Sequence, residues 1–169
     1  MKKLFVCLVC CVVAVTFSSC GRKSYVNVGG LKWAAKNVGA TEDNPYGDLY
    51  TYDQALKACP DGWRLPTSDE LERLCLQYSK PVSYDGMNGV WLSGSTPYKD
   101  GVDAVFLPMA GCSEGYGKED VDSSGFYWSS TAVDDEVARG LGVRDVFGRP
   151  VCMGDGIRSV AFSVRCVKK

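Results

Sequence analysis

The sequence contains nine cysteines, the most reactive nucleophiles among the side chains, but no histidine that could activate them. Without an imidazole, neither a Ser-His-Asp nor a Cys-His nucleophile can be assembled, and most zinc sites are excluded as well. No two acidic residues are spaced as a general acid and base would be. We therefore expect a protein that is not an enzyme and that uses no cofactor and no metal.

The first twenty residues have the pattern of an export signal. Lys2 and Lys3 precede an apolar stretch over 4–17, which is too short for a bilayer span of about 20 residues. The segment Phe17-Ser18-Ser19-Cys20 resembles a bacterial lipobox, whose cysteine is acylated and becomes the first residue after cleavage. We expect a lipoprotein signal peptide over 1–19, a palmitate-type lipid on Cys20 and a tether over 20–24. The alternative is ordinary secretion with cleavage near Ser19 and no lipid.

The charge balance argues against nucleic acid as a partner. Residues 1–19 contain two lysines and no acidic residue, so the rest of the chain has 17 basic and 20 acidic side chains, a net charge of −3. A surface that binds phosphate backbones is strongly basic. We instead expect a membrane-attached protein of the cell envelope, in the outer membrane, with a lipid anchor as its contact to the bilayer.

The residues after the tether predict a hairpin and two short helices. Alternating runs over 25–28 and 31–34 flank Gly29-Gly30, which is typical of a tight hairpin. Thr51 with Gln54, and Thr67 with Glu70, form two capping boxes. Apolar residues recur at helical spacing after each box, so that we expect helices ending at Pro60 and Pro81.

From residue 82 onward the pattern changes to short apolar runs separated by Gly, Ser and Asp. These runs predict short antiparallel strands joined by long loops. They lie at 90–92, 102–109, 126–128, 137–143 and 160–167. Helices early in the chain and strands late favour the α+β class.

Acidic and aromatic residues in the loops are the remaining candidates for binding. The clusters 119–122 and 134–136 could donate oxygens to calcium, but solvated turns explain them as well. Tyr84, Tyr98 and Tyr116 lie in glycine-rich sequence, where exposed tyrosines are typical of surfaces that contact a protein or a glycan. The four tryptophans lie in apolar segments, which predicts packing in the core.

One stretch carries a specific resemblance to a known family. The run Ala58-Cys59-Pro60-Asp61-Gly62-Trp63-Arg64-Leu65-Pro66-Thr67, followed by Glu70-Leu71, resembles the signature of the Fibrobacter succinogenes major paralogous domain, which is common in surface proteins of Bacteroidetes-type bacteria. Further stretches agree in order, and the resemblance covers about residues 25–168. The agreeing stretches are 28–37, 46–51, 106–111, 126–131 and 162–167.

This resemblance implies a fold similar to that of C-type lectins, over a single domain at 25–169. Two short helices would pack on a small antiparallel sheet whose first and last strands meet, with a long irregular loop region at the other end. The sequences through which such domains bind sugar with calcium do not occur here.

The resemblance also implies a disulfide between Cys59 and Cys166, the positions that are bridged in lectin-like domains. An exported chain meets oxidising conditions, which favours the bridge over two buried thiols. Among the cysteines that follow the predicted signal peptide and the lipid-attachment residue Cys20, three remain outside this bridge: Cys75, Cys112 and Cys152. A second disulfide between Cys112 and Cys152 is the alternative to free thiols, and Cys75 is expected to be a buried free thiol.

The segment from Arg64 to Thr67, with Glu70, also resembles formylglycine-generating enzymes. Their chemistry uses a close pair of reactive cysteines near the C-terminal end. Here Cys152 and Cys166 are 14 positions apart, and Cys166 is assigned to the bridge. A catalytic function is therefore not expected.

The expected function is that of an envelope lipoprotein with a noncatalytic binding or adhesion domain. Its loops between about residues 84 and 156 would contact a glycan or a surface protein. The alternative is a structural or assembly subunit of an envelope complex or filament, which would expose a larger apolar patch or an unpaired strand edge.

Overall fold

The hairpin expected at the start of the domain is present and begins a four-stranded sheet. The computed structural model describes residues 24–94, 97, 99, 101–146 and 149–169. β1 (Tyr25–Val28) and β2 (Leu31–Ala34) pair antiparallel across Gly29 and Gly30, whose φ angles of 59° and 79° suit a two-residue turn. β12 (Val167–Lys168) pairs with both β2 and β4 (Trp63–Arg64). The last strand of the chain therefore lies beside the first hairpin of the described residues.

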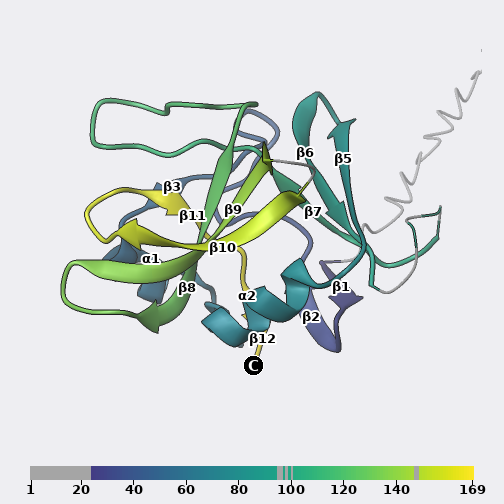
Figure 1. Cartoon of the computed structure of the whole chain (residues 1–169), viewed down its shortest axis with the longest axis horizontal. Coiled ribbons are helices and arrows are strands. Elements are labelled where there is room, and N and C mark those ends of the chain that lie inside the picture. Colours follow the sequence, from purple (N-terminus) through teal and green to yellow (C-terminus); the bar gives the residue numbers. More distant parts are fainter. Residues whose placement is uncertain (1–23, 95–96, 98, 100, 147–148) are drawn as a thin grey trace, which may run out of the picture.

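The longest strands form a five-stranded sheet in the order β10-β9-β8-β11-β3. β8, β9 and β10 form an antiparallel meander, whereas β11 pairs parallel to β8 and antiparallel to β3. In Figure 1 the green and yellow strands of this sheet cross the middle of the molecule. The bounds are β3 (Leu49–Tyr50), β8 (Gly125–Ala132), β9 (Val137–Val146), β10 (Arg149–Ile157) and β11 (Phe162–Ser163).

The third sheet has the order β5-β6-β7 and contains a strand that the sequence pattern did not predict. β5 (Ser79–Tyr84) pairs antiparallel with β6 (Met87–Leu92), which pairs with β7 (Val105–Pro108). Asp85 and Gly86 join β5 to β6, with φ angles of 53° and 78°. Two successive positive φ angles are those of a type I′ turn, for which Asp-Gly is a preferred sequence.

Both predicted helices are present and begin at their capping boxes. α1 (Tyr52–Ala58) follows Thr51, and α2 (Ser68–Cys75) follows Thr67. The helix expected to end at Pro81 already ends at Cys75, and the chain continues as β5. In Figure 1, α2 lies beneath the five-stranded sheet and α1 lies at its left side.

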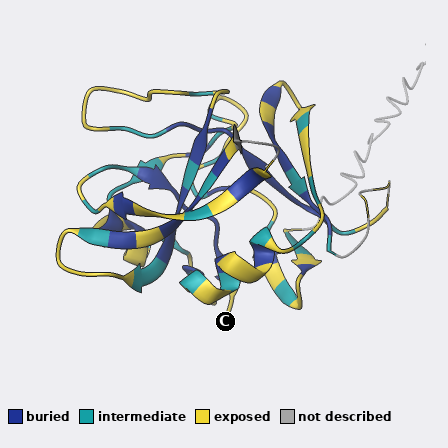
Figure 2. Ribbon diagram, viewed as in Figure 1, coloured by how far each residue is buried: buried dark blue, intermediate teal, exposed yellow. Residues whose placement is uncertain are grey.

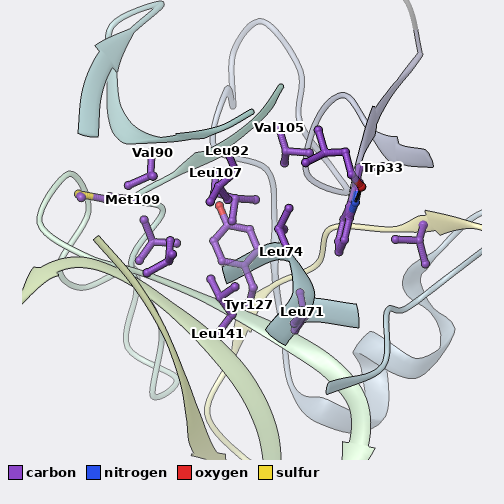
Figure 3. Packing of buried hydrophobic residues seen from close by; sticks show 14 residues of the cluster. Trp33, Leu71, Leu74, Val90, Leu92, Val105, Leu107, Met109, Tyr127 and Leu141 are labelled. Atoms are coloured by element: carbon purple, nitrogen blue, oxygen red, sulfur yellow. Dashed lines mark hydrogen bonds between the residues drawn. The ribbon is translucent and has the colours of Figure 1, made fainter. Parts of the chain in front are cut away.

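Apolar side chains pack in two clusters, and Figure 2 shows in dark blue where along the ribbon the buried residues lie. The larger cluster joins Leu71 and Leu74 of α2 to residues of β6 to β10, and Figure 3 shows Tyr127 and Leu141 at its centre. The smaller cluster is built around Trp128 and contains both cysteines of the disulfide described below.

The expected α+β, C-type lectin-like arrangement is wrong. The structure is mostly β, with only two short helices and with its strands in three sheets. The segment expected to be a long irregular loop region contains the paired strands β6 to β10, although the described residues of 93–104 and 109–124 lie outside the strands. The physical reason is that turns such as Asp85-Gly86 return the chain directly into paired strands.

No helix within the described residues is long and apolar enough to cross a membrane. The predicted signal peptide, Cys20 and Tyr98 lie outside the described residues.

Candidate functional site

Three aromatic rings from three strands meet on one face of the β5-β6-β7 sheet. Tyr84 ends β5, Trp91 lies in β6, and Phe106 lies directly opposite Trp91 in β7. The ring centroids are 5.0 Å apart for Tyr84 and Trp91, 5.2 Å for Tyr84 and Phe106, and 5.2 Å for Trp91 and Phe106. Phe106 is buried, Trp91 is partly exposed, and Tyr84 is 44% exposed. We call these three residues the aromatic cluster.

Gly89 makes room for the aromatic cluster. It lies on the same face of β6 as Trp91, two residues away, because side chains alternate along a strand. A Cβ atom at Gly89 would lie 2.6 Å from Cζ of Phe106 and 2.5 Å from the carbonyl oxygen of Leu107. The ring of Phe106 thus fills the space that a side chain at this position would need, a known way of stabilising glycine in a strand.

Arg165 lies beneath the cluster and is almost completely buried. Nη2 donates to the carbonyl oxygen of Phe106 at 2.9 Å, and Nη1 donates to those of Ala34 at 3.1 Å and Ala35 at 3.2 Å. Nε and Nη2 also donate to Oδ1 of Asn37, at 2.9 and 2.7 Å. All five N–H groups of the guanidinium are therefore engaged by neutral oxygens.

Burial lowers the pKa of Arg165 to about 10. At neutral pH the side chain is still charged, so a positive charge lies under the aromatic cluster. Arg165 has no proton to exchange at physiological pH and no free N–H to offer. It can act on a ligand through its field and by holding the surrounding backbone rigid.

The aromatic cluster and Arg165 border a groove with a volume of about 1240 Å³. Its rim carries the exposed side chains of Lys36, Glu42 and Asp85. The walls come from the start of β1, the end of β2 with the loop after it, the end of α1, the β5–β6 hairpin and β7. Partly exposed aromatic rings beside a few charged groups are typical of sites that bind small polar ligands.

A family model gives the identity of the whole domain. The model for the Fibrobacter succinogenes major domain matches residues 23–168, which include every wall of the groove. The chain belongs to this family. No curated protein and no solved structure shows significant similarity to it.

Of the residues predicted to contact a ligand in this major-domain protein, Tyr84 lies in the groove and Tyr116 does not. Tyr116 is 97% exposed in the loop that precedes the predicted acidic cluster at 119–122. It is not among the residues that border the groove. Tyr84 therefore becomes the better candidate of the two.

The disulfide between Cys59 and Cys166 is present, with Cα atoms 5.9 Å apart and 107 positions between the residues. The alternative of a second disulfide between Cys112 and Cys152 is wrong, because both thiols are free. Cys112 packs against the smaller apolar cluster, whereas Cys152 is exposed on β10. Burial, helped by the nearby Cys152 and Glu72, raises the pKa of Cys75 to about 12, which keeps this thiol protonated and unreactive.

Residues of the acidic clusters accept hydrogen bonds within their own loop or from distant segments. Oδ1 of Asp134 accepts hydrogen bonds from the backbone N–H groups of Glu136 and Val137. Oδ1 of Asp122 accepts from the hydroxyl of Tyr46 at 2.7 Å and from the backbone N–H of Asn88 at 2.9 Å. Within the described residues no group of acidic or cysteine side chains is arranged to hold a metal ion.

Arg64 has a structural role. Its Nη1 and Nη2 donate to the two carboxylate oxygens of Glu70 at 2.7 and 2.6 Å. Glu70 also accepts from the backbone N–H of Thr67, and these contacts, led by the Arg64 hydrogen bonds, hold the pKa of Glu70 below its usual value. The specific motif of this family thus fixes the start of α2.

Trp91 and Phe106 are the residues of the site that the sequence interpretation missed. Trp91 was expected to pack in the core, and Phe106 was expected only to be part of an apolar strand. The Asp85-Gly86 dipeptide was the available signal: it predicts a hairpin, and a hairpin would have aligned β5 with β6.

Proposed function

We propose that this chain is an envelope lipoprotein whose domain binds glycans without catalysis, through the groove beside the aromatic cluster. Its N-terminal pattern supports export and acylation at Cys20. The observation that carries the proposal is the exposure of Tyr84 and Trp91 at a groove. Neighbouring aromatic rings that are partly exposed at a groove, unlike a single exposed ring, are typical of contact surfaces.

The chemistry of the groove fits a pyranose ring. The apolar C–H face of a sugar packs on aromatic rings, and its hydroxyl groups need nearby donors and acceptors. Tyr84 and Trp91 supply the rings, while Lys36 and Asp85 supply charged hydrogen-bonding groups.

The alternative function, a subunit of an envelope assembly, is favoured by one feature. β10 is an outer strand of the five-stranded sheet and nine residues long, and such edges can pair with another chain. Pro150 and the ion pair between Asp155 and Arg139 weaken this edge as a pairing site. The groove is therefore the preferred site.

The full-length protein, solubilised in detergent, is to be applied to an array of neutral and acidic oligosaccharides built of pyranose rings. We expect retention, and we expect Tyr84→Ala and Trp91→Ala to weaken it about tenfold, the loss typical of an aromatic contact residue. Tyr116→Ala is the matched control, because it removes an exposed tyrosine outside the groove.

Thermal unfolding of each variant separates lost binding from lost folding, and Tyr84→Ala is the safer variant because its ring is partly exposed. The proposal is wrong if no glycan retains the protein, or if Tyr116→Ala weakens retention while Tyr84→Ala does not. Mass spectrometry of the same material tests acylation: a lipid mass on Cys20 that is absent from Cys20→Ser is expected.

A further inference from the structure

The chain leaves the domain at the rim of the groove. Ser24 and Ala35 both border the groove, and the backbone N–H of Ala35 donates to the carbonyl oxygen of Ser24 at 3.0 Å. This hydrogen bond fixes the exit point of the chain beside the site. The residue that is bonded to Ser24 on its N-terminal side is therefore also close to the groove.

The anchor can lie only a short distance away. Ser24 is four positions after Cys20, and a fully extended chain over four positions spans at most about 14 Å. A bilayer is about 30 Å thick across its hydrocarbon core and about 40–45 Å thick with its headgroups, so the headgroup layer of one leaflet is about 5–7 Å thick. If Cys20 carries the lipid, the groove is held just above the headgroups.

We infer that the occupant of the groove is the sugar headgroup of a glycolipid in the membrane that holds the anchor. The inference rests on the proposed glycan binding and adds the source of the glycan. A tether this short gives headgroups in the same membrane a high effective concentration at the groove. A glycan on another cell would have to enter between the domain and the bilayer.

The side chains around the groove suit a headgroup. Tyr84 and Trp91 offer rings for one sugar, Asp85 and Lys36 lie on the rim, and the buried charge of Arg165 gives the floor a positive field.

The test uses full-length acylated protein in phosphatidylcholine vesicles that contain a photoreactive monoglycosyl diacylglycerol, with the methyl glycoside of the same sugar as the soluble probe. We expect crosslinking to the wild-type protein, about a tenfold loss in Tyr84→Ala, and no loss in Tyr116→Ala. The crosslinked peptide should come from the β5–β6 hairpin or β7.

A flexible insertion of about 30 Gly and Ser residues between Lys23 and Ser24 tests the role of the tether. It should lower glycolipid crosslinking about fivefold, because effective concentration falls as a linker lengthens, and leave binding of the methyl glycoside unchanged. The same insertion after Lys169 is the control and should change neither.

The outcomes separate the two proposals. Binding of the methyl glycoside without crosslinking of the glycolipid, or crosslinking that the tether insertion does not lower, overturns the membrane source and leaves glycan binding intact. Loss of both signals overturns both proposals. Crosslinking of the groove by a photoreactive acyl chain on Cys20, in vesicles free of glycolipid, would show that the protein's own lipid occupies it and would also overturn the inference.

Discussion

Arg165 shows how one buried side chain organises the site. It binds Asn37, which is 128 positions away in the sequence, and the carbonyl oxygen of Phe106, which is 59 positions away. A buried charge without hydrogen-bonding partners would be very costly. The five N–H groups of Arg165 therefore keep their acceptors, and with them these segments, at fixed positions. The aromatic cluster therefore rests on a rigid floor.

We predict that Arg165→Met lowers the free energy of unfolding by about 3 kcal/mol or more. Methionine leaves the buried carbonyl oxygen of Phe106 and Oδ1 of Asn37 without the donors of Arg165, and the part-buried carbonyl oxygens of Ala34 and Ala35 lose theirs as well. Each unsatisfied buried group costs about 1–3 kcal/mol. Urea unfolding of the full chain, followed by tryptophan fluorescence, measures the change. Arg139→Met is the matched control, since Arg139 is 48% exposed in its ion pair with Asp155, and its loss should cost less than about 1 kcal/mol. Equal urea midpoints for Arg165→Met and the wild-type protein would contradict the role given to Arg165.

At the scale of elements, the β5–β6 hairpin creates the site. Its Asp85-Gly86 turn sets the register that places Tyr84 and Trp91 on one face. Gly89 between them leaves the space that the ring of Phe106 fills. A change in this one strand should therefore affect both stability and binding.

Gly89→Ala is expected to lower the free energy of unfolding by about 1–3 kcal/mol, because the added methyl group must displace the ring of Phe106 or the backbone at Leu107. Glycan retention should fall with it, since the ring supports Tyr84. Gly154→Ala is the control: Gly154 also lies in a strand, but nothing is within 4 Å of its added Cβ, and the change should stay within about 0.5 kcal/mol. Urea unfolding and the glycan array measure the two effects. If Gly89→Ala and Gly154→Ala lower the free energy of unfolding equally, the packing of the Phe106 ring does not depend on the missing side chain at Gly89.

On the scale of the whole molecule, the C-terminal end of the domain is attached to earlier segments at two places. β12 pairs with β2 beside the first hairpin, and the disulfide ties Cys166 to Cys59 after α1. Arg165 lies next to this disulfide in the sequence. The same closure that stabilises the domain therefore places the guanidinium under the groove.

Replacing both Cys59 and Cys166 by serine should lower the free energy of unfolding by about 4 kcal/mol, because the bridge closes a loop of more than 100 residues in the unfolded chain. Thermal unfolding of oxidised protein measures the loss. Cys152→Ser is the control, since this exposed thiol forms no bridge, and it should leave the transition within about 0.5 kcal/mol. If the double variant unfolds at the wild-type temperature, the bridge does not hold the ends of the domain.

Local features of this fold could be predicted because each depends on a few neighbouring residues. Gly29-Gly30 predicted the first turn, and the boxes at Thr51 and Thr67 predicted where the helices begin. The prediction that the second helix extends to Pro81 is wrong. Proline is also tolerated in a strand at the edge of a sheet, and Pro81 lies in such a strand, β5.

By itself the sequence determined the family, the absence of histidine chemistry and the first hairpin, because these depend on residue types and short spacings. The bridge between Cys59 and Cys166 also followed, once the family resemblance was used. Only the tertiary structure decided that Tyr84, Trp91 and Phe106 meet, that Arg165 lies beneath them, and that Ser24 leaves the domain at their groove. The physical reason is that these contacts depend on strand register and on the packing of distant segments, which no local pattern specifies.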